Sequence, residues 1–176
     1  MAGGYATCAD FCKVFNDNVD RLYTLALLLT ADYEMAEHCF LSAFEDCMGS
    51  KTVFREWAES WAKRTTIITA IRIVLAPKTK AGMHVSRVSI EDPTSETHVL
   101  VAQISSLDAF DRLVYVMSVL EKMSLRECAL LMGCSVREIT DAKVRALERV
   151  KYIPFIQTIE RNFRRNRLGD VAMATP

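Results

Sequence analysis

Side chains that could form hydrogen bonds to nucleic-acid bases and phosphates gather around two Ser-x-x-Glu patterns in the second half of the chain. These patterns are Ser124–Glu127 and Ser135–Glu138. Each is typical of a capping box, in which the serine hydroxyl and the glutamate carboxylate each accept from a backbone N–H of a starting helix. Gly133 lies between them, where an ending helix favours a residue that tolerates positive φ. The pattern predicts a short helix, a turn over residues 133–135 and a longer second helix.

That spacing is typical of a helix-turn-helix, whose second helix enters the major groove of DNA. An ordinary helical hairpin would carry the same caps, so both interpretations stay open. The charged and hydroxyl side chains of the motif could bind phosphates and base edges. These candidates are Arg126, Ser135, Arg137, Glu138, Thr140, Asp141, Lys143 and Arg145. We expect the core-facing positions of the second helix to be Val136, Ile139, Ala142, Ala146 and Val150.

A second group of candidates lies in a helix predicted from about residue 53 to 75. Aromatic rings and cations on one helix can stack on exposed bases and hold phosphates. Two core tryptophans beside a solvated basic face would give the same pattern. The candidates are Trp57, Trp61, Lys63, Arg64 and Arg72.

The elements that must position these groups all read as helices, because apolar residues recur at helical spacing. Helices are expected over residues 10–30, from after Asp32 to about Met48, over 107–120 and from 136 to about 152. Between the two halves, Pro, Gly, Ser and Thr break the periodicity, apart from a short helix near residues 96–104. The expected fold is all-α, with two small helical domains joined by a flexible linker. Their expected limits are 8–76 for the first domain, 77–104 for the linker and 105–168 for the second, helix-turn-helix domain.

The net charge of zero hides strong local charge. Residues 51–80 carry 7 basic and 2 acidic side chains, and residues 152–168 carry 4 basic and 1 acidic. Phosphate binding requires local positive potential, which both segments supply. Charge blocks are also common on plain solvated surfaces.

Several classes of protein fit the sequence poorly. The longest apolar run, residues 25–29, is too short to span a bilayer, and the first residues do not resemble a signal peptide, so a cytoplasmic protein without membrane insertion is expected. The six cysteines are interpreted as reduced small hydrophobes, and the spacing of Cys8, Cys12, His38 and Cys39 matches no zinc finger. No nucleophile–base set or phosphate-binding glycine loop is present, so we expect no enzyme, cofactor or metal.

Both halves together resemble the extracytoplasmic-function class of bacterial sigma factors. Residues 107–115 resemble the family's Leu-Pro-x-x-x-Arg-x-Val-Phe, and residues 124–135 resemble its Ser-x-x-Glu-Ile-Ala-x-x-Leu-Gly-x-Ser. In the first half, residues 21–26 and 29–32 look like Leu-Tyr-x-Leu-Ala and Thr-Gly-Asp. The similarity covers roughly residues 10–75 and 105–151.

The resemblance implies a transcription initiation factor that directs core RNA polymerase to promoters. Its first domain would bind the beta-prime subunit through Ala36, Glu37, Phe40, Leu41 and Phe44. The Trp57–Arg72 helix would engage promoter DNA near the start site and hold melted bases, and the last two helices would read an element further upstream. An anti-sigma factor is a further candidate partner.

Two departures from the family keep alternatives open. Residues 35–42 retain only Ala36 and Glu37 of the usual docking sequence, and residues 140–143 read Thr-Asp-Ala-Lys where the family usually has Lys-Ser-Arg-Leu. The alternatives are a sigma-derived DNA-binding regulator that does not itself activate core polymerase, and a helical protein-interaction adaptor.

Overall fold

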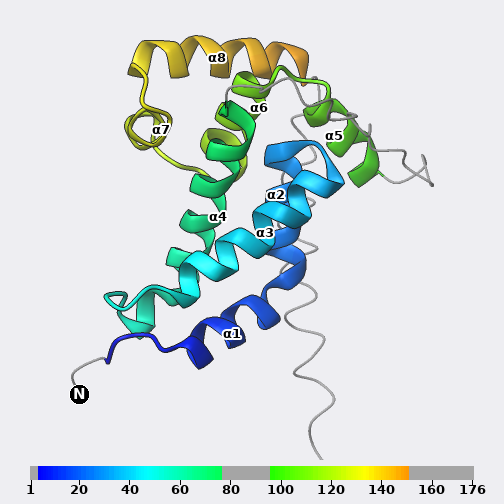
Figure 1. The fold of residues 1–176 in the computed structure, drawn as a ribbon. Helices are drawn as coiled ribbons and strands as arrows, with labels where there is room; N and C mark the ends of the chain where they lie inside the picture. Colours follow the sequence, from blue (N-terminus) through cyan, green and yellow to red (C-terminus); the bar gives the residue numbers. More distant parts are fainter. Residues whose placement is uncertain (1–3, 77–95, 151–176) are drawn as a thin grey trace, which may run out of the picture.

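The computed structural model describes residues 4–76 and 96–150, and the regular elements within them are all helical (Figure 1). Eight α-helices, a 3-10 turn (η1) and a π-helical turn (η2) occur in these residues. Helices α1 to α4 form one group, and α8 crosses the end of the molecule away from α1 (Figure 1). The predicted all-α class is confirmed. Most of the predicted linker (77–95) and the basic segment 152–168 lie outside the described residues.

The first predicted helix is two helices, α1 (Cys8–Asp17) and α2 (Val19–Thr30). The prediction of one helix over residues 10–30 is wrong at Asn18, whose φ of −123° and ψ of 21° are not helical. The Asn18 side-chain amide donates to the carbonyl of Val14 at 2.9 Å. Such a local side-chain bond competes with the helical hydrogen-bond ladder, which explains the break.

Helix α3 (Tyr33–Met48) has the limits that its caps predict. The Asp32 carboxylate accepts from the Met35 N–H at 2.9 Å and so satisfies a free donor of the first turn. Ala31, with a left-handed φ of 57°, ends α2 immediately before it. The short connection makes α2 and α3 neighbours in the bundle (Figure 1).

Helix α4 (Ala58–Leu75) begins later than the predicted residue 53, after the turn η1 (Arg55–Trp57). Residues before it pair with the N-terminal segment instead. The Ala6 N–H donates to the Val53 carbonyl at 2.7 Å, and the Arg55 N–H donates to the Gly4 carbonyl at 3.0 Å. These long-range hydrogen bonds hold residues 53–55 away from the helix.

The second half opens with α5 (Glu96–Ser105), which confirms the predicted short helix. The helix predicted over 107–120 is α6 (Ala109–Tyr115) followed by η2 (Val116–Leu120). Helices α7 (Leu125–Met132) and α8 (Val136–Arg149) complete the described chain.

Buried residues of both halves form one apolar cluster. The cluster includes Leu29 and Ile67 from the first half and Leu113 and Ile139 from the second. A smaller apolar cluster joins α1 to its neighbours and includes Phe11 and Phe15 of α1 and Ala43 of α3. The two halves of the described chain therefore pack against each other.

A buried arginine joins the halves where α2 ends. The Arg112 guanidinium of α6 donates to the carbonyls of Leu29 at 3.0 Å, Leu107 at 3.1 Å and Thr30 at 3.2 Å. The last carbonyls of a helix lack partners within the helix and carry partial negative charge, so a cation there is favourable. Burial lowers the pKa of Arg112 from its usual value. This contact fixes α6 against the end of α2.

Candidate nucleic-acid interface

The turn between α7 and α8 has the geometry that its residues predict. Gly133 adopts φ 66° and ψ 33°, and its N–H donates to the Ala129 carbonyl. This left-handed conformation favours glycine, because a Cβ would be strained there. The Cys134 N–H also donates to the Ala129 carbonyl, at 3.1 Å. The turn therefore ends α7 and sets the direction in which α8 starts.

The capping box predicted at the start of α8 is complete. The Glu138 N–H donates to Ser135 Oγ at 3.2 Å, and the Ser135 N–H donates to Glu138 Oε2 at 2.8 Å. The Ser135 hydroxyl donates to the same carboxylate oxygen at 2.7 Å. These bonds lower the pKa of Glu138 from its usual value. Both side chains, predicted as DNA contacts, are engaged in the cap.

At the start of α7 only half of the predicted box is present. The Glu127 N–H donates to Ser124 Oγ at 3.2 Å, as expected. The Glu127 carboxylate does not return to the cap, because it accepts from Arg64 of α4 at 2.8 Å. The prediction of two complete capping boxes is therefore wrong at Glu127, whose charge is used to join the halves.

The exposed face of α8 carries most of the predicted DNA-binding residues. Ile139, Ala142 and Ala146 are buried, as predicted, and Val150 after the helix is buried too. Val136 was predicted to face the core, but it is 43% exposed. The predicted contacts on the exposed face are Arg137, Glu138, Thr140, Asp141 and Arg145, and Lys143 is half-buried beside them.

Some of the predicted DNA-binding side chains form hydrogen bonds within the described residues, and others do not. Arg126, Arg137 and Lys143 make no hydrogen bond or ion pair in the described part of the chain. The Thr140 hydroxyl donates to the Val136 carbonyl at 2.8 Å, which leaves its methyl group and oxygen lone pairs outward. The free cations therefore flank the turn and the first turns of α8.

Arg145 is the predicted contact that the structure assigns to another partner. Its Nε and Nη2 donate to the two carboxylate oxygens of Asp111 at 3.1 and 2.7 Å. Asp111 is buried on α6, and this bidentate bond raises the pKa of Arg145. Arg149 similarly donates to Asp108 at 2.9 Å. Arg145 therefore fixes α8 on α6 rather than presenting a free cation.

Both predicted tryptophans, Trp57 at the end of η1 and Trp61 in α4, lie at the surface. Trp57 is 58% exposed and Trp61 is 40% exposed, so the interpretation as core tryptophans is wrong. Phe54 packs edge-on against Trp57, with ring centroids 5.4 Å apart, and stacks on Tyr5 at 5.1 Å. Sequence reasoning missed Tyr5 and Phe54, because the pairing of residues 4–6 with 53–55 leaves no local pattern.

The predicted cations of α4 are all in ion pairs. Lys63 Nζ lies 2.9 Å from Glu121 Oε2, just after η2, and Arg64 pairs with Glu127 of α7. Arg72 lies 3.5 Å from Asp46 of α3. Two of the three pairs cross between the halves, so the second half neutralises part of the basic surface of α4.

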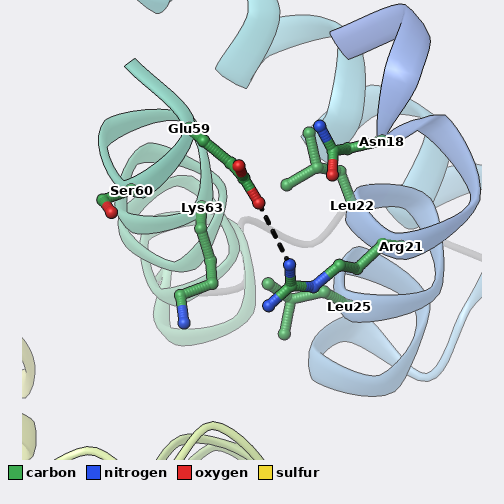
Figure 2. Close-up of a pocket in the computed structure, with 7 residues that line it drawn as sticks. All are labelled: Asn18, Arg21, Leu22, Leu25, Glu59, Ser60 and Lys63. Carbon is green, nitrogen blue, oxygen red and sulfur yellow. Dashed lines mark hydrogen bonds and ion pairs between the residues drawn. The ribbon is translucent and has the colours of Figure 1, made fainter. Parts of the chain in front are cut away.

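A small open pocket of about 80 Å³ lies between α2 and α4, next to this surface (Figure 2). Arg21 and Glu59 form an ion pair of 3.2 Å across it, and Lys63 extends from its α4 wall (Figure 2). The rest of its lining consists of Asn18, Leu22, Leu25 and Ser60. Its volume suffices for a few water molecules.

The predicted polymerase-binding residues of α3 divide into three sets by their exposure. Ala36 is fully buried, so its prediction as a docking contact is wrong. Phe40 and Phe44 are half-buried and pack edge-on against Phe15, at centroid distances of 5.4 and 5.0 Å. Glu37 is exposed, and Leu41 is 51% exposed. Of the five predicted residues, only these last two are exposed.

No family model, curated protein or solved structure matches the chain. In the described residues, no helix combines the length and apolar character that crossing a membrane requires.

Proposed function

We propose that the chain is a DNA-binding transcription initiation factor of the sigma type, which directs core RNA polymerase to specific promoters. The main support is the connection of α7 to α8, where Gly133 has a left-handed conformation and Ser135 caps α8. Two short helices joined in this way suit a helix-turn-helix, with α8 in the major groove. The free cations Arg126 and Arg137 flank this groove-facing surface.

Specific roles follow from the exposed chemistry of α8. Arg137 would donate to base edges, the Thr140 oxygen would accept from a base amino group, and Asp141 would accept from a cytosine amino group. The methyl groups of Val144, which is half exposed, would pack against a thymine methyl. Arg126 and the half-buried Lys143 would bind phosphates and fix the register. Arg145 would act as a positioning residue through Asp111.

The first half would supply the other two functions of the factor. Trp57 and Trp61 would stack on unpaired bases, since base stacking on exposed aromatic rings tolerates any sequence. Glu37 and Leu41 would contact the beta-prime subunit. Residues 77–104 would link the two helical units.

The proposed DNA surface is testable through the salt dependence of binding. The double variant Arg126→Ala/Arg137→Ala should weaken binding of the full chain to duplex DNA and flatten its dependence on salt by about one unit of slope per lost phosphate contact. Lys13→Ala is the control, since Lys13 is an exposed cation of α1 with no ion pair in the described residues. An equal effect of Lys13→Ala, or an unchanged slope in the double variant, would contradict the assignment.

A second candidate is a sigma-derived DNA-binding regulator that does not activate polymerase. The ion pairs of Lys63 and Arg64 favour it, because they leave α4 without free cations for DNA. Gel filtration with purified core polymerase separates the two candidates. Co-elution that Leu41→Asp abolishes supports the initiation factor, and DNA binding without co-elution supports the regulator.

A further inference from the structure

Three sulfur-bearing residues lie together where α1 passes the end of α3, and α1 is at the end of the molecule opposite α8 (Figure 1). Cys8 and Cys12 lie one helical turn apart on α1, and Met48 is the last residue of α3. Cys12 Sγ lies 3.9 Å from Met48 Sδ, and Cys8 Sγ lies 3.6 Å from the Met48 carbonyl oxygen. Both thiols therefore converge on Met48.

Both cysteines of this cluster are exposed, although the sequence favoured reduced cysteines that act as small hydrophobes. Two helical residues four apart have Cβ atoms about 5–6 Å apart. A disulfide requires about 3.5–4.5 Å between Cβ atoms, so helix α1 disfavours a bond between Cys8 and Cys12. The geometry thus leaves two exposed thiols one helical turn apart, and Cys12 contacts the Met48 thioether while Cys8 contacts the Met48 carbonyl.

The sulfur spacing suits a shared metal ion. With metal–sulfur bonds of about 2.3 Å and a trigonal angle of 120°, two sulfur ligands are about 4.0 Å apart. The observed 3.9 Å between Cys12 Sγ and Met48 Sδ is close to this value. The two atoms would need almost no movement to bind one ion.

The ligand chemistry selects a soft ion. Thiolate and thioether sulfur favour Cu(I), whereas Zn²⁺ sites usually take four Cys, His or carboxylate ligands. Among residues 4–76 and 96–150, no group of three or more His, Cys, Asp or Glu side chains could hold a metal. The cluster at Met48 thus offers the wrong set for Zn²⁺ and a suitable set for Cu(I). The sequence spacing of the cysteines did not predict this cluster, because its third sulfur belongs to a methionine distant in the sequence.

We propose that Cys8, Cys12 and Met48 form a binding site for one soft monovalent metal ion of the Cu(I) type. As the two thiols bind Cu⁺, each loses its proton to solvent, and the Met48 thioether donates a lone pair without losing a proton. The site then carries a net charge of −1, and no group is oxidised or reduced. The ion would tie the start of α1 to the end of α3. This inference does not depend on the proposed function in transcription.

The other cysteines provide internal controls. Cys39 and Cys47 are fully buried, and burial raises the pKa of their thiols to about 12 and about 11, so neither supplies a thiolate near neutral pH. Cys134 is partly exposed in the turn before α8, far along the chain from α1. Cys134→Ser therefore removes a thiol without touching the proposed site.

The test is an anaerobic titration of the full chain with Cu(I) in competition with a chromogenic Cu(I) chelator. The wild type and Cys134→Ser should withhold one ion per chain and release two protons per ion. Cys8→Ser/Cys12→Ser should lose at least about tenfold in affinity, and Met48→Leu, which keeps the side-chain volume, should lose about threefold or more. Circular dichroism checks that each variant is folded. The proposal is wrong if the wild type does not take Cu(I) from the chelator, or if the double variant binds Cu(I) as tightly as the wild type. Unchanged affinity in Met48→Leu would overturn the three-sulfur assignment.

Discussion

The ion pairs between the halves predict that the chain limits its own DNA binding through α4. Lys63 and Arg64 pair with Glu121 and Glu127, so a carboxylate already balances the charge of each cation and competes with a phosphate for it. The double variant Glu121→Gln/Glu127→Gln keeps the size of both side chains, removes their charge and replaces one acceptor oxygen of each by an NH2 donor. We expect this variant to bind DNA more tightly than the wild type.

The size of the gain follows from the exposure of the two pairs. Their side chains are 18–43% exposed, so each pair is worth about 0.2–1 kcal/mol, the range for partly exposed pairs. Two pairs together contribute about 0.4–2 kcal/mol, which corresponds to a gain in affinity of roughly 2- to 30-fold. Two additional phosphate contacts also steepen the salt dependence by about 1.4 units for single-stranded DNA.

Fluorescence anisotropy with a labelled duplex that contains an unpaired tract, at several salt concentrations between 50 and 200 mM, measures both quantities. The control is Glu34→Gln/Glu45→Gln, which changes the net charge equally on exposed positions of α3 that have no ion pair in the described residues. If both double variants bind with the same affinity and slope, the ion pairs do not restrict α4 and the reasoning is refuted.

Three further changes probe the α7–α8 unit. Arg145→Ala should lower the urea midpoint of unfolding more than Arg137→Ala, because it leaves the buried carboxylate of Asp111 without its cation; equal midpoints would contradict the positioning role. Gly133→Ala should cost about 1 kcal/mol of unfolding free energy, measured in urea, because its φ of 66° is strained for alanine, and an unchanged midpoint would refute this. Glu138→Gln should reduce stability above pH 4.5, the ordinary pKa of the side chain. Because the cap lowers the pKa of Glu138 in the folded state, the difference in unfolding free energy between wild type and variant should shrink as pH falls through that lowered pKa. Urea unfolding at several pH values measures this difference, and a difference that does not change with pH would contradict the prediction.

The features that could be predicted from the sequence are those determined by neighbours in the chain. The limits of α3 and the turn at Gly133 follow from caps within four residues, and both are as expected. The full box at Ser135 is local in the same way. The spacing of apolar residues also predicted correctly which residues of α8 are buried, except for Val136, which is exposed in its first turn.

The features that could not be predicted depend on partners far away in the sequence. Glu127 follows the capping pattern, yet Arg64, which lies 63 residues earlier, binds its carboxylate. The late start of α4 depends on hydrogen bonds to residues 4–6. Burial of Ala36 and exposure of Trp57 depend on how α3 and α4 pack, which the helical period alone does not determine. The candidate DNA surface was therefore predictable as a set of residue types, and not as a set of free side chains.

The contacts between the halves suit an interface that can open. Arg112, Lys63 and Arg64 are held by carbonyl or carboxylate oxygens, and all of these groups can exchange their partners for water when the halves separate. The apolar residues shared by both halves oppose separation, because opening would expose them to water. A ligand that pairs with Lys63 and Arg64 replaces the lost ion pairs and so offsets part of that cost. Under the proposed function, DNA phosphates would be such a ligand, and their binding to α4 would then favour release of the second half.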